Sequence, residues 1–246
     1  MEGYDRWAAS YDDVPNPLLA REDRFLTPLF SDLRGKVVLD LACGTGRWLE
    51  KFVARECAAG IGVDLSLAML GVGARKNALR EHLAQAACES LPLPNAAFDL
   101  AICSFALGHV ADMGRMAREL SRVTKNGADV FVSDLHPDAY ARGWRVGFRD
   151  GATALQIHVQ PWSTEQIVQA FSANGFECSE HLPLFLGEPE RPLFAKAGKS
   201  ASFAEACQIP AVLICHFRRN ALSSAELQPD PVHSRRCHAS GATEEM

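Results

Sequence analysis

The stretch Val37-Val38-Leu39-Asp40-Leu41-Ala42-Cys43-Gly44-Thr45-Gly46-Arg47-Trp48 places a short apolar run, a glycine turn and the start of a helical pattern in direct succession. The run 37–41 is typical of a strand that is covered on both faces of a parallel sheet. Glycines 44 and 46 let the backbone turn sharply and approach a ligand where a side chain would block it. The stretch therefore predicts a strand–turn–helix unit whose turn binds a ligand.

A second apolar run, Gly60-Ile61-Gly62-Val63, ends at Asp64. A carboxylate at the end of the next strand can accept hydrogen bonds from the two hydroxyls of a ribose, so the spacing favours a nucleoside. A nicotinamide fingerprint would need a third glycine at position 49, where this chain has Leu49. A nicotinamide-dependent oxidoreductase is therefore disfavoured.

The pattern Asp40-x-Ala42-x-Gly44-x-Gly46 resembles motif I of the class I S-adenosylmethionine-dependent methyltransferases, and among them the UbiE-like or type-11-like subgroup that acts on small molecules. Three later segments are similar to the same family in order and spacing. Residues 91–100 resemble the approach to its fourth strand, 105–112 the turn after that strand, and 118–127 the helix and glycine turn before the fifth.

The resemblance implies S-adenosyl-L-methionine as cofactor, with the glycine turn against its methionine part, Asp64 on the ribose and Leu65 against the adenine. Ala87 departs from the family at a position where an aspartate often holds the adenine amino group, so Cys88 or Glu89 is the replacement considered. Tyr11 is expected to close over the cofactor, and Ser104 to line the methyl end with Phe105. The residues implied at the cofactor are Tyr11, Asp40, Ala42, Cys43, Gly44, Gly46, Asp64, Leu65, Cys88, Glu89 and Ser104.

Strand-like runs alternate with helical ones, which predicts an α/β fold with a doubly wound, Rossmann-like, mostly parallel sheet of seven strands. The family adds an antiparallel strand in a hairpin at the sheet edge. One helix is expected over 165–173 with Ser163 as its N-cap, and a short helix within 184–210. The strands are expected at 37–41, 60–64, 83–87, 98–103, 129–134, 176–182 and 212–218.

Many glycines and prolines interrupt residues 136–162, which predicts a loop or hairpin that forms a lid after the fifth strand. The domain is expected to span 1–221, and the polar segment 222–246 is expected to be disordered. A length of 246 residues with 48% hydrophobic content suits one α/β domain.

The net charge of −5 disfavours a nucleic-acid partner. The sequence shows no signal peptide or membrane-spanning run, so a cytoplasmic protein without a membrane partner is expected. The 8 cysteines contain no CxxC pair, so no metal site is expected. The oligomeric state is left open.

Methyl transfer from a sulfonium requires chiefly positioning and exclusion of water, whereas a hydroxyl acceptor also needs a base to take its proton. Three histidines are candidates: His136 first, because it follows Asp134 at a strand end, then His109 and His158. The alternative for His136 is a cap of the turn before Pro137. The leading interpretation is an O-methyltransferase of a small molecule. N- or C-methylation and a non-catalytic module that binds S-adenosylmethionine or S-adenosylhomocysteine are the alternatives.

The predicted lid is rich in aromatic and arginine side chains, which can sandwich a flat ring and pair an acidic group. An aromatic or carboxylated acceptor is therefore one interpretation, and a minor core with solvated arginines is the other. The side chains concerned are Tyr140, Trp144, Phe148, Trp162, Arg142, Arg145 and Arg149.

Overall fold

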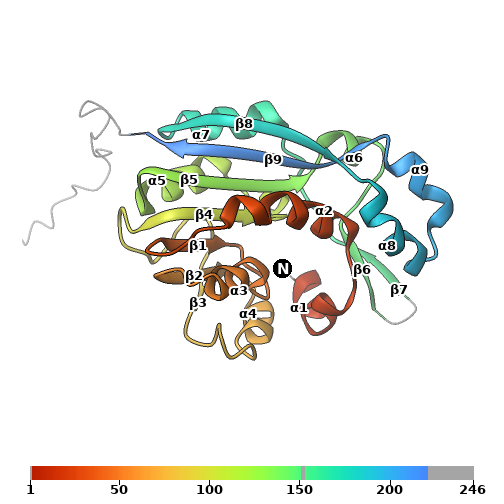
Figure 1. Cartoon of the computed structure of the whole chain (residues 1–246), viewed down its shortest axis with the longest axis horizontal. Coiled ribbons are helices and arrows are strands. Elements are labelled where there is room, and N and C mark those ends of the chain that lie inside the picture. The colour runs from red at the N-terminus through yellow and green to blue at the C-terminus, as the bar shows by residue number, and fades with distance from the viewer. Residues whose placement is uncertain (1, 151–152, 221–246) are drawn as a thin grey trace, which may run out of the picture.

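A seven-stranded sheet forms the centre of the computed structural model, which describes residues 2–150 and 153–220 (Figure 1). Its strand order is β3-β2-β1-β4-β5-β9-β8, and the predicted tail 222–246 lies outside the described residues. The strands are β1 (Val37–Leu41), β2 (Ala59–Asp64), β3 (Leu83–Gln85), β4 (Phe98–Ser104), β5 (Thr124–Leu135), β8 (Phe176–Phe185) and β9 (Pro210–Arg219).

Strands β1 to β5 pair in parallel, and β9 runs antiparallel to both β5 and β8. The predicted mostly parallel, doubly wound sheet with an edge hairpin is therefore confirmed, with β9 next to the edge strand β8. The strand order reverses at β1, because β2 and β3 lie on one side of it and β4 and β5 lie on the other. Ligands of open α/β sheets bind at this reversal, outside the carboxyl ends of the strands.

The helices lie on both faces of the sheet, with α2 in front and α5 and α7 behind in Figure 1. The α-helices are α1 (Glu2–Trp7), α2 (Pro17–Leu26), α3 (Arg47–Ala54), α4 (Leu67–Gly73), α5 (Met113–Val123), α6 (Pro137–Ala141), α7 (Thr164–Ser172), α8 (Arg191–Lys196) and α9 (Phe203–Ala206). The 3₁₀ helices are η1 (Ala8–Asp13), η2 (Thr27–Phe30), η3 (Leu107–His109), η4 (Glu188–Glu190) and η5 (Ser200–Ser202). Helix α7 begins with the predicted N-cap Ser163, whose side chain accepts from the backbone N–H of Gln166 in a capping box.

Two apolar cores lie on the two faces because successive strand residues point in opposite directions. In β4, Ala101 and Cys103 join the core under α5 and α7, whereas Leu100 and Ile102 join the core under α2 and α3. Burial on both faces explains why the central strands read as continuous apolar runs.

The predicted lid segment contains α6 and a hairpin of β6 (Gly147–Asp150) and β7 (Thr153–Gln156), which form a separate two-stranded sheet. This hairpin lies beside the N-terminal helix α1 (Figure 1). The ring of Trp7 stacks on Phe148, with 5.0 Å between ring centroids.

Two hydrogen bonds attach the N-terminal segment to the carboxyl ends of the strands. Ser66 Oγ donates to Asp5 at 2.7 Å, and Thr45 Oγ1 donates to Asp12 at 2.7 Å. The segment therefore covers the sheet edge at which a ligand is expected.

Candidate functional site

A cavity of about 230 Å³ opens at the carboxyl ends of β1, β2 and β4, under the N-terminal segment. It lies at the point where strand order reverses, as the sequence pattern predicts. Its lining residues are Tyr4, Tyr11, Leu19, Asp40, Ala42, Cys43, Gly44, Thr45, Arg47, Trp48, Asp64, Leu65, Ser66, Met69, Cys88, Glu89, Ser104, Phe105, Ala106, His109 and Val110.

The turn after β1 has a left-handed backbone at three positions. Ala42, Gly44 and Gly46 have φ values of 54°, 57° and 82°. Ala42 has a left-handed backbone although it is not glycine, which is uncommon. The same backbone explains why many members of the methyltransferase family that the sequence resembles have glycine at this position. At Gly46, which precedes α3, a Cβ atom would lie 2.4 Å from Leu79 Cδ1. Gly46 therefore shapes the turn, and it is not among the residues that line the cavity.

Asp64 connects this turn to the end of β2. Its Oδ2 accepts from the backbone N–H of Gly44 at 2.8 Å, and its Oδ1 accepts from that of Ser66 at 2.8 Å. Burial raises the pKa of the Asp64 carboxyl, and these backbone hydrogen bonds oppose the rise. An ionised carboxylate has about four acceptor positions, so each oxygen retains a lone pair for a ligand hydroxyl.

Asp40 lines the cavity but is almost fully buried. Its Oδ2 accepts from the backbone N–H of Leu49 at 2.9 Å and so satisfies a donor in the first turn of α3. Burial raises the pKa of Asp40 to about 7. Asp40 therefore joins β1 to α3, and its carboxyl group holds a proton more readily than an exposed aspartate does.

The end of the cavity beside β3 is formed by Leu65, Cys88 and Glu89. Leu65 is 44% exposed, so its apolar side chain is accessible at this end of the cavity. Glu89 Oε1 accepts from the backbone N–H of Ala111 at 3.0 Å, which holds that carboxylate at the rim. An apolar side chain beside a carboxylate is a suitable surface for a flat base that carries an amino group.

Of the three candidate histidines, His109 lines the cavity. Its Nε2 lies 3.0 Å from the hydroxyl of Tyr4, and burial lowers the pKa of the imidazole. Burial also raises the pKa of Tyr4. The pair is therefore neutral at physiological pH, and its imidazole can accept a proton.

His136 and His158 lie outside the lining of this cavity. His136 caps α6, because its Nδ1 accepts from the backbone N–H of Asp138 at 3.2 Å. Asp134 accepts instead from the backbone N–H groups of Gly108 and Leu135, at 2.9 and 2.6 Å. The expected pairing of Asp134 with His136 is thus replaced by a cap, and His158 is exposed on the lid.

The aromatic side chains of the predicted lid are absent from the lining of this cavity. Phe148 stacks on Trp7, and Trp162 Nε1 donates to the carbonyl of Leu107 at 3.0 Å. Arg145 lies over the ring of Tyr140, 4.0 Å from its centroid. These contacts favour the interpretation of the lid residues as a minor core that attaches the insertion to the domain.

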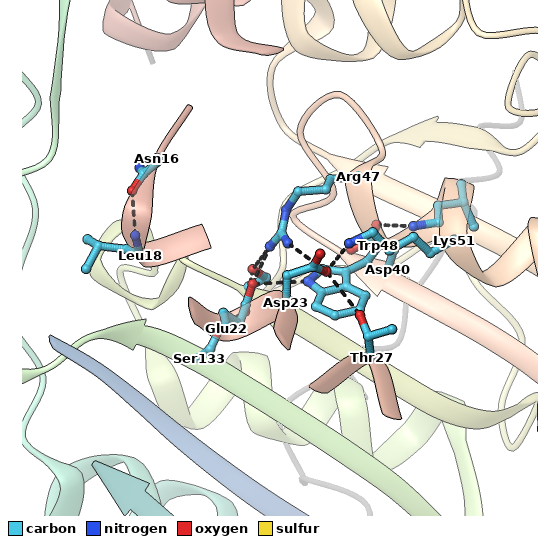
Figure 2. Close-up of polar contacts among 12 residues, drawn as sticks. Asn16, Leu18, Glu22, Asp23, Thr27, Asp40, Arg47, Trp48, Lys51 and Ser133 are labelled. Atoms are coloured by element: carbon cyan, nitrogen blue, oxygen red, sulfur yellow. Dashed lines mark hydrogen bonds and ion pairs between the residues drawn. The ribbon is translucent and has the colours of Figure 1, made fainter. Parts of the chain in front are cut away.

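A buried polar network lies beside the cavity, and sequence reasoning missed it (Figure 2). Glu22 of α2 is fully buried and accepts hydrogen bonds from Arg47 and from Ser133. Ser104 Oγ donates to Glu22 at 2.8 Å, and Trp48 Nε1 donates to it at 3.3 Å. Elements α2, α3, β4 and β5 therefore meet at one carboxylate.

A family model for a methyltransferase domain matches residues 15–181. The chain belongs to this methyltransferase family. The methyltransferase domain is 42% identical over 105 residues to a demethylmenaquinone methyltransferase of Thermobifida fusca, covering 41% of this chain and 44% of that protein. It is 34% identical over 146 residues to a ubiquinone/menaquinone biosynthesis C-methyltransferase UbiE of Hahella chejuensis, covering 54% of this chain and 57% of that protein.

The chain spans about half the length of the curated relatives it matches. The fold of the methyltransferase domain is similar to the crystal structure of an S-adenosylmethionine-dependent methyltransferase from Mesorhizobium loti. The TM-score is 0.64 at 21% identity, with 83% of this chain and 100% of that chain covered. The predicted family and fold are therefore confirmed.

Residues of the methyltransferase domain that sequence reasoning did not assign to the cavity include Leu19, Arg47 and Met69. The sequence does contain a signal for the buried polar network around Glu22. Leu18, Glu22 and Leu26 fall on one face of α2 at four-residue spacing, so an acid interrupts an apolar stripe. A carboxylate at such a position needs a buried partner.

Two kinds of feature are absent from residues 2–150 and 153–220 of the methyltransferase domain. None of its described helices combines the length and apolar character needed to cross a bilayer. Within the same ranges, no cluster of three or more histidine, cysteine, aspartate or glutamate side chains is arranged to hold a metal ion.

Proposed function

We propose that this methyltransferase domain transfers a methyl group from S-adenosyl-L-methionine to a small-molecule acceptor in the cavity. The observation that carries the proposal is the position of Asp64 at the point where strand order reverses. Its two carboxylate oxygens accept hydrogen bonds from the backbone N–H groups of Gly44 and Ser66, and so connect the turn after β1 to the end of β2. A left-handed turn with glycine at its centre and a half-satisfied carboxylate beside it fit the aminoacyl and ribose parts of this cofactor.

In this proposal the adenosine lies over β1 and β2, with its ribose hydroxyls on Asp64 and its base between Leu65 and the Cys88–Glu89 turn. The turn from Ala42 to Gly44 holds the methionine part, Tyr11 covers it, and Ser104 faces the methyl end. Asp40 supports the turn through α3. When bound, the cofactor supplies a methyl group on a sulfonium, which is already activated for displacement.

For the acceptor atom we propose a carbon beside an ionisable hydroxyl. The two relatives described above carry the names of a demethylmenaquinone methyltransferase and a C-methyltransferase, which supports carbon over oxygen. The hydroxyl oxygen itself is the second candidate, and it is favoured by the presence of a neutral imidazole in the cavity. Both reactions begin with loss of the same hydroxyl proton.

His109 is the proposed base. It lines the cavity, its lowered pKa keeps it neutral, and the hydroxyl of Tyr4 lies within hydrogen-bonding distance of its Nε2. The proton of the acceptor hydroxyl passes to His109, either directly or through the Tyr4 hydroxyl. His109→Asn should therefore reduce turnover while leaving the affinity for S-adenosylhomocysteine within about threefold of wild type.

Calorimetric titration with S-adenosylmethionine and S-adenosylhomocysteine tests the cofactor site. Hydrogen bonds to charged groups contribute about 1.5–3 kcal/mol each, so loss of two ribose contacts in Asp64→Ala should weaken binding by about 100-fold or more. Asp32→Ala is the matched control, because Asp32 is exposed and contacts Arg34 on the surface. Absence of binding to the wild type would refute the proposal.

Incubation with methyl-labelled S-adenosylmethionine and a panel of hydroquinones, phenols and enols tests the reaction. Nuclear magnetic resonance of the product distinguishes a methyl group on carbon from one on oxygen. Tight cofactor binding with no transfer to any member of the panel would favour the non-catalytic binding module instead.

A further inference from the structure

Arg47 carries the single guanidinium or ammonium group among the described residues that line the cavity, whereas Asp40, Asp64 and Glu89 supply carboxyl groups. Cavities rarely retain a partly buried arginine without a partner for its donors. Of the Arg47 side chain, 25% is exposed, so the guanidinium is largely shielded from bulk water. A negatively charged ligand atom in this cavity has Arg47 as its cationic partner.

The position of Arg47 assigns it to the acceptor half of the cavity. Its Nη2 donates to Ser104 at the end of β4, at 2.8 Å, and to Glu22, which is bound in turn by Ser133 of β5. The proposed adenosine site on Asp64 and Leu65 lies over β2, on the other side of β1. The guanidinium therefore extends from the glycine turn toward β4 and β5.

The guanidinium retains donors that the described residues do not use. It has five N–H groups, and its hydrogen bonds to Glu22 and Ser104 both come from Nη2. Nη1 is buried without a hydrogen bond in the described part of the chain, and it lies 3.8 Å from Asp23 Oδ1. A planar fork with free donors suits a ligand oxygen that carries negative charge.

Glu22 keeps this guanidinium in place. Its carboxylate is fully buried and receives hydrogen bonds from four side chains on three other elements, as Figure 2 shows in part. Asp23 beside it pairs with Lys51, so the two acids balance the two bases. Attraction of a ligand oxygen by Arg47 therefore depends on direct N–H contact and not on a long-range positive field.

We propose that Arg47 binds the ionised oxygen of an acceptor that reacts as a phenolate or enolate, with Glu22 as its positioning residue. This inference rests on the proposed function and names its substrate class. The hydroxyl proton of the acceptor goes to His109, and the electron pair of the neighbouring carbon forms the bond to the methyl carbon as the bond from methyl to sulfur breaks. The acceptor carbon then releases its own proton, and the oxygen regains one.

This arrangement favours methylation at carbon. The lone pairs of an oxygen held by Arg47 are engaged by N–H donors and are shielded from the methyl group, whereas methylation of that oxygen would require this contact to break. Charge at the oxygen is delocalised onto the neighbouring carbon of an enolate or phenolate, so that carbon remains nucleophilic while the oxygen is bound.

The test uses two probes of similar shape, 4-nitrophenol and 4-nitroanisole, titrated into protein saturated with S-adenosylhomocysteine. The phenolate absorbs at a longer wavelength than the phenol, so its bound protonation state is read directly. Wild type should bind the phenolate at least tenfold more tightly than the ether, and the preference should vanish in Arg47→Gln. Arg24→Gln is the matched control, because Arg24 pairs with Glu190 and is absent from the cavity lining.

Arg47→Lys should retain only part of the preference, because an ammonium lacks the guanidinium fork. The double variant Glu22→Leu/Arg47→Met removes both charges together, so it tests the loss of preference if Arg47→Gln fails to fold. A preference that survives in Arg47→Gln or in the double variant, or that is absent from wild type, overturns the inference.

A second comparison separates the acceptor from the carboxylate of the cofactor. S-adenosyl-3-thiopropylamine differs from S-adenosylhomocysteine by the absence of the carboxylate. If Arg47→Gln weakens binding of S-adenosylhomocysteine tenfold but leaves the decarboxylated analogue unchanged, Arg47 serves the cofactor and the inference is wrong. Failure of wild type to bind S-adenosylhomocysteine at all refutes the proposed function instead, and the nitrophenol titration of the protein alone still decides the role of Arg47.

Discussion

Replacement of Glu22 by leucine should destabilise the fold by about 3 kcal/mol. Glu22 is fully buried, and its loss leaves Arg47 without its principal charge partner. Removal of one member of a buried ion pair costs about 3–5 kcal/mol, because the other charge remains in a poorly solvated site. The lower end applies here, since a quarter of the Arg47 side chain is exposed. Domains have a total stability of about 5–15 kcal/mol, so the variant should fold but unfold at lower denaturant.

Urea unfolding followed by tryptophan fluorescence measures this change, since Trp48 donates to Glu22. Glu22→Leu/Arg47→Met should recover most of the loss, because neither buried charge remains. Glu188→Leu is the control: Glu188 pairs with Arg191 on the surface, where exposed pairs contribute about 0–1 kcal/mol. A loss below about 1 kcal/mol in Glu22→Leu, or a double variant no more stable than the single one, would refute the reasoning.

Three further predictions concern the same region. Burial raises the pKa of Asp40 to about 7, so the folded chain keeps a proton that the unfolded chain releases above about pH 4, and stability falls as pH rises between these values. The free energy of unfolding of Asp40→Asn, measured relative to wild type in urea titrations, should therefore increase by about 2 kcal/mol from pH 5 to pH 8. A difference that is the same at both pH values would contradict the raised pKa. Gly46→Ala should lower the melting temperature, because its φ is 82° and its Cβ would clash with Leu79, whereas Gly71→Ala on α4 has free space and should not. Trp7→Ala should increase the dissociation rate of S-adenosylhomocysteine in stopped-flow measurements, and an unchanged rate would show that the N-terminal segment does not cover the cofactor.

The sheet could be predicted from sequence because its central strands are buried on both faces and therefore appear as continuous apolar runs. The apolar runs at 37–41 and 98–103 coincide with β1 and β4 almost residue for residue. The expected start of β5 at 129 was late, since β5 begins at Thr124. Its first residues, Lys125-Asn126-Gly127, are polar and follow directly from α5, and a register shift separates the pairs at Phe98 and Leu100. No hydrophobic pattern marks such a segment as a strand.

The parts of the site that lie at strand ends could also be predicted, because their placement follows from topology alone. Asp64 and Ser104 end β2 and β4, and both line the cavity. The histidines could not be ranked in this way. His136 precedes Pro137, whose ring suits the first turn of a helix, and the imidazole is used as the cap. His109 enters the cavity beside Tyr4, a residue 105 positions away in the chain.

The hydrogen-bond network around Glu22 could be predicted only in part from the sequence. An acid between Leu18 and Leu26 indicates that something polar must face α2, but the pattern does not say what. The partners come from α3, β4 and β5, and only their convergence makes one carboxylate hold an arginine at the cavity. Glu22 accepts a hydrogen bond from Arg47 Nη2, whereas Arg47 Nη1 has no hydrogen-bond partner among the described residues. The contact that stabilises the fold therefore also fixes the orientation of a guanidinium that retains an unused donor group. Loss of Glu22 should therefore lower both stability and the preference for a phenolate, whereas loss of the surface residue Glu188 should affect neither.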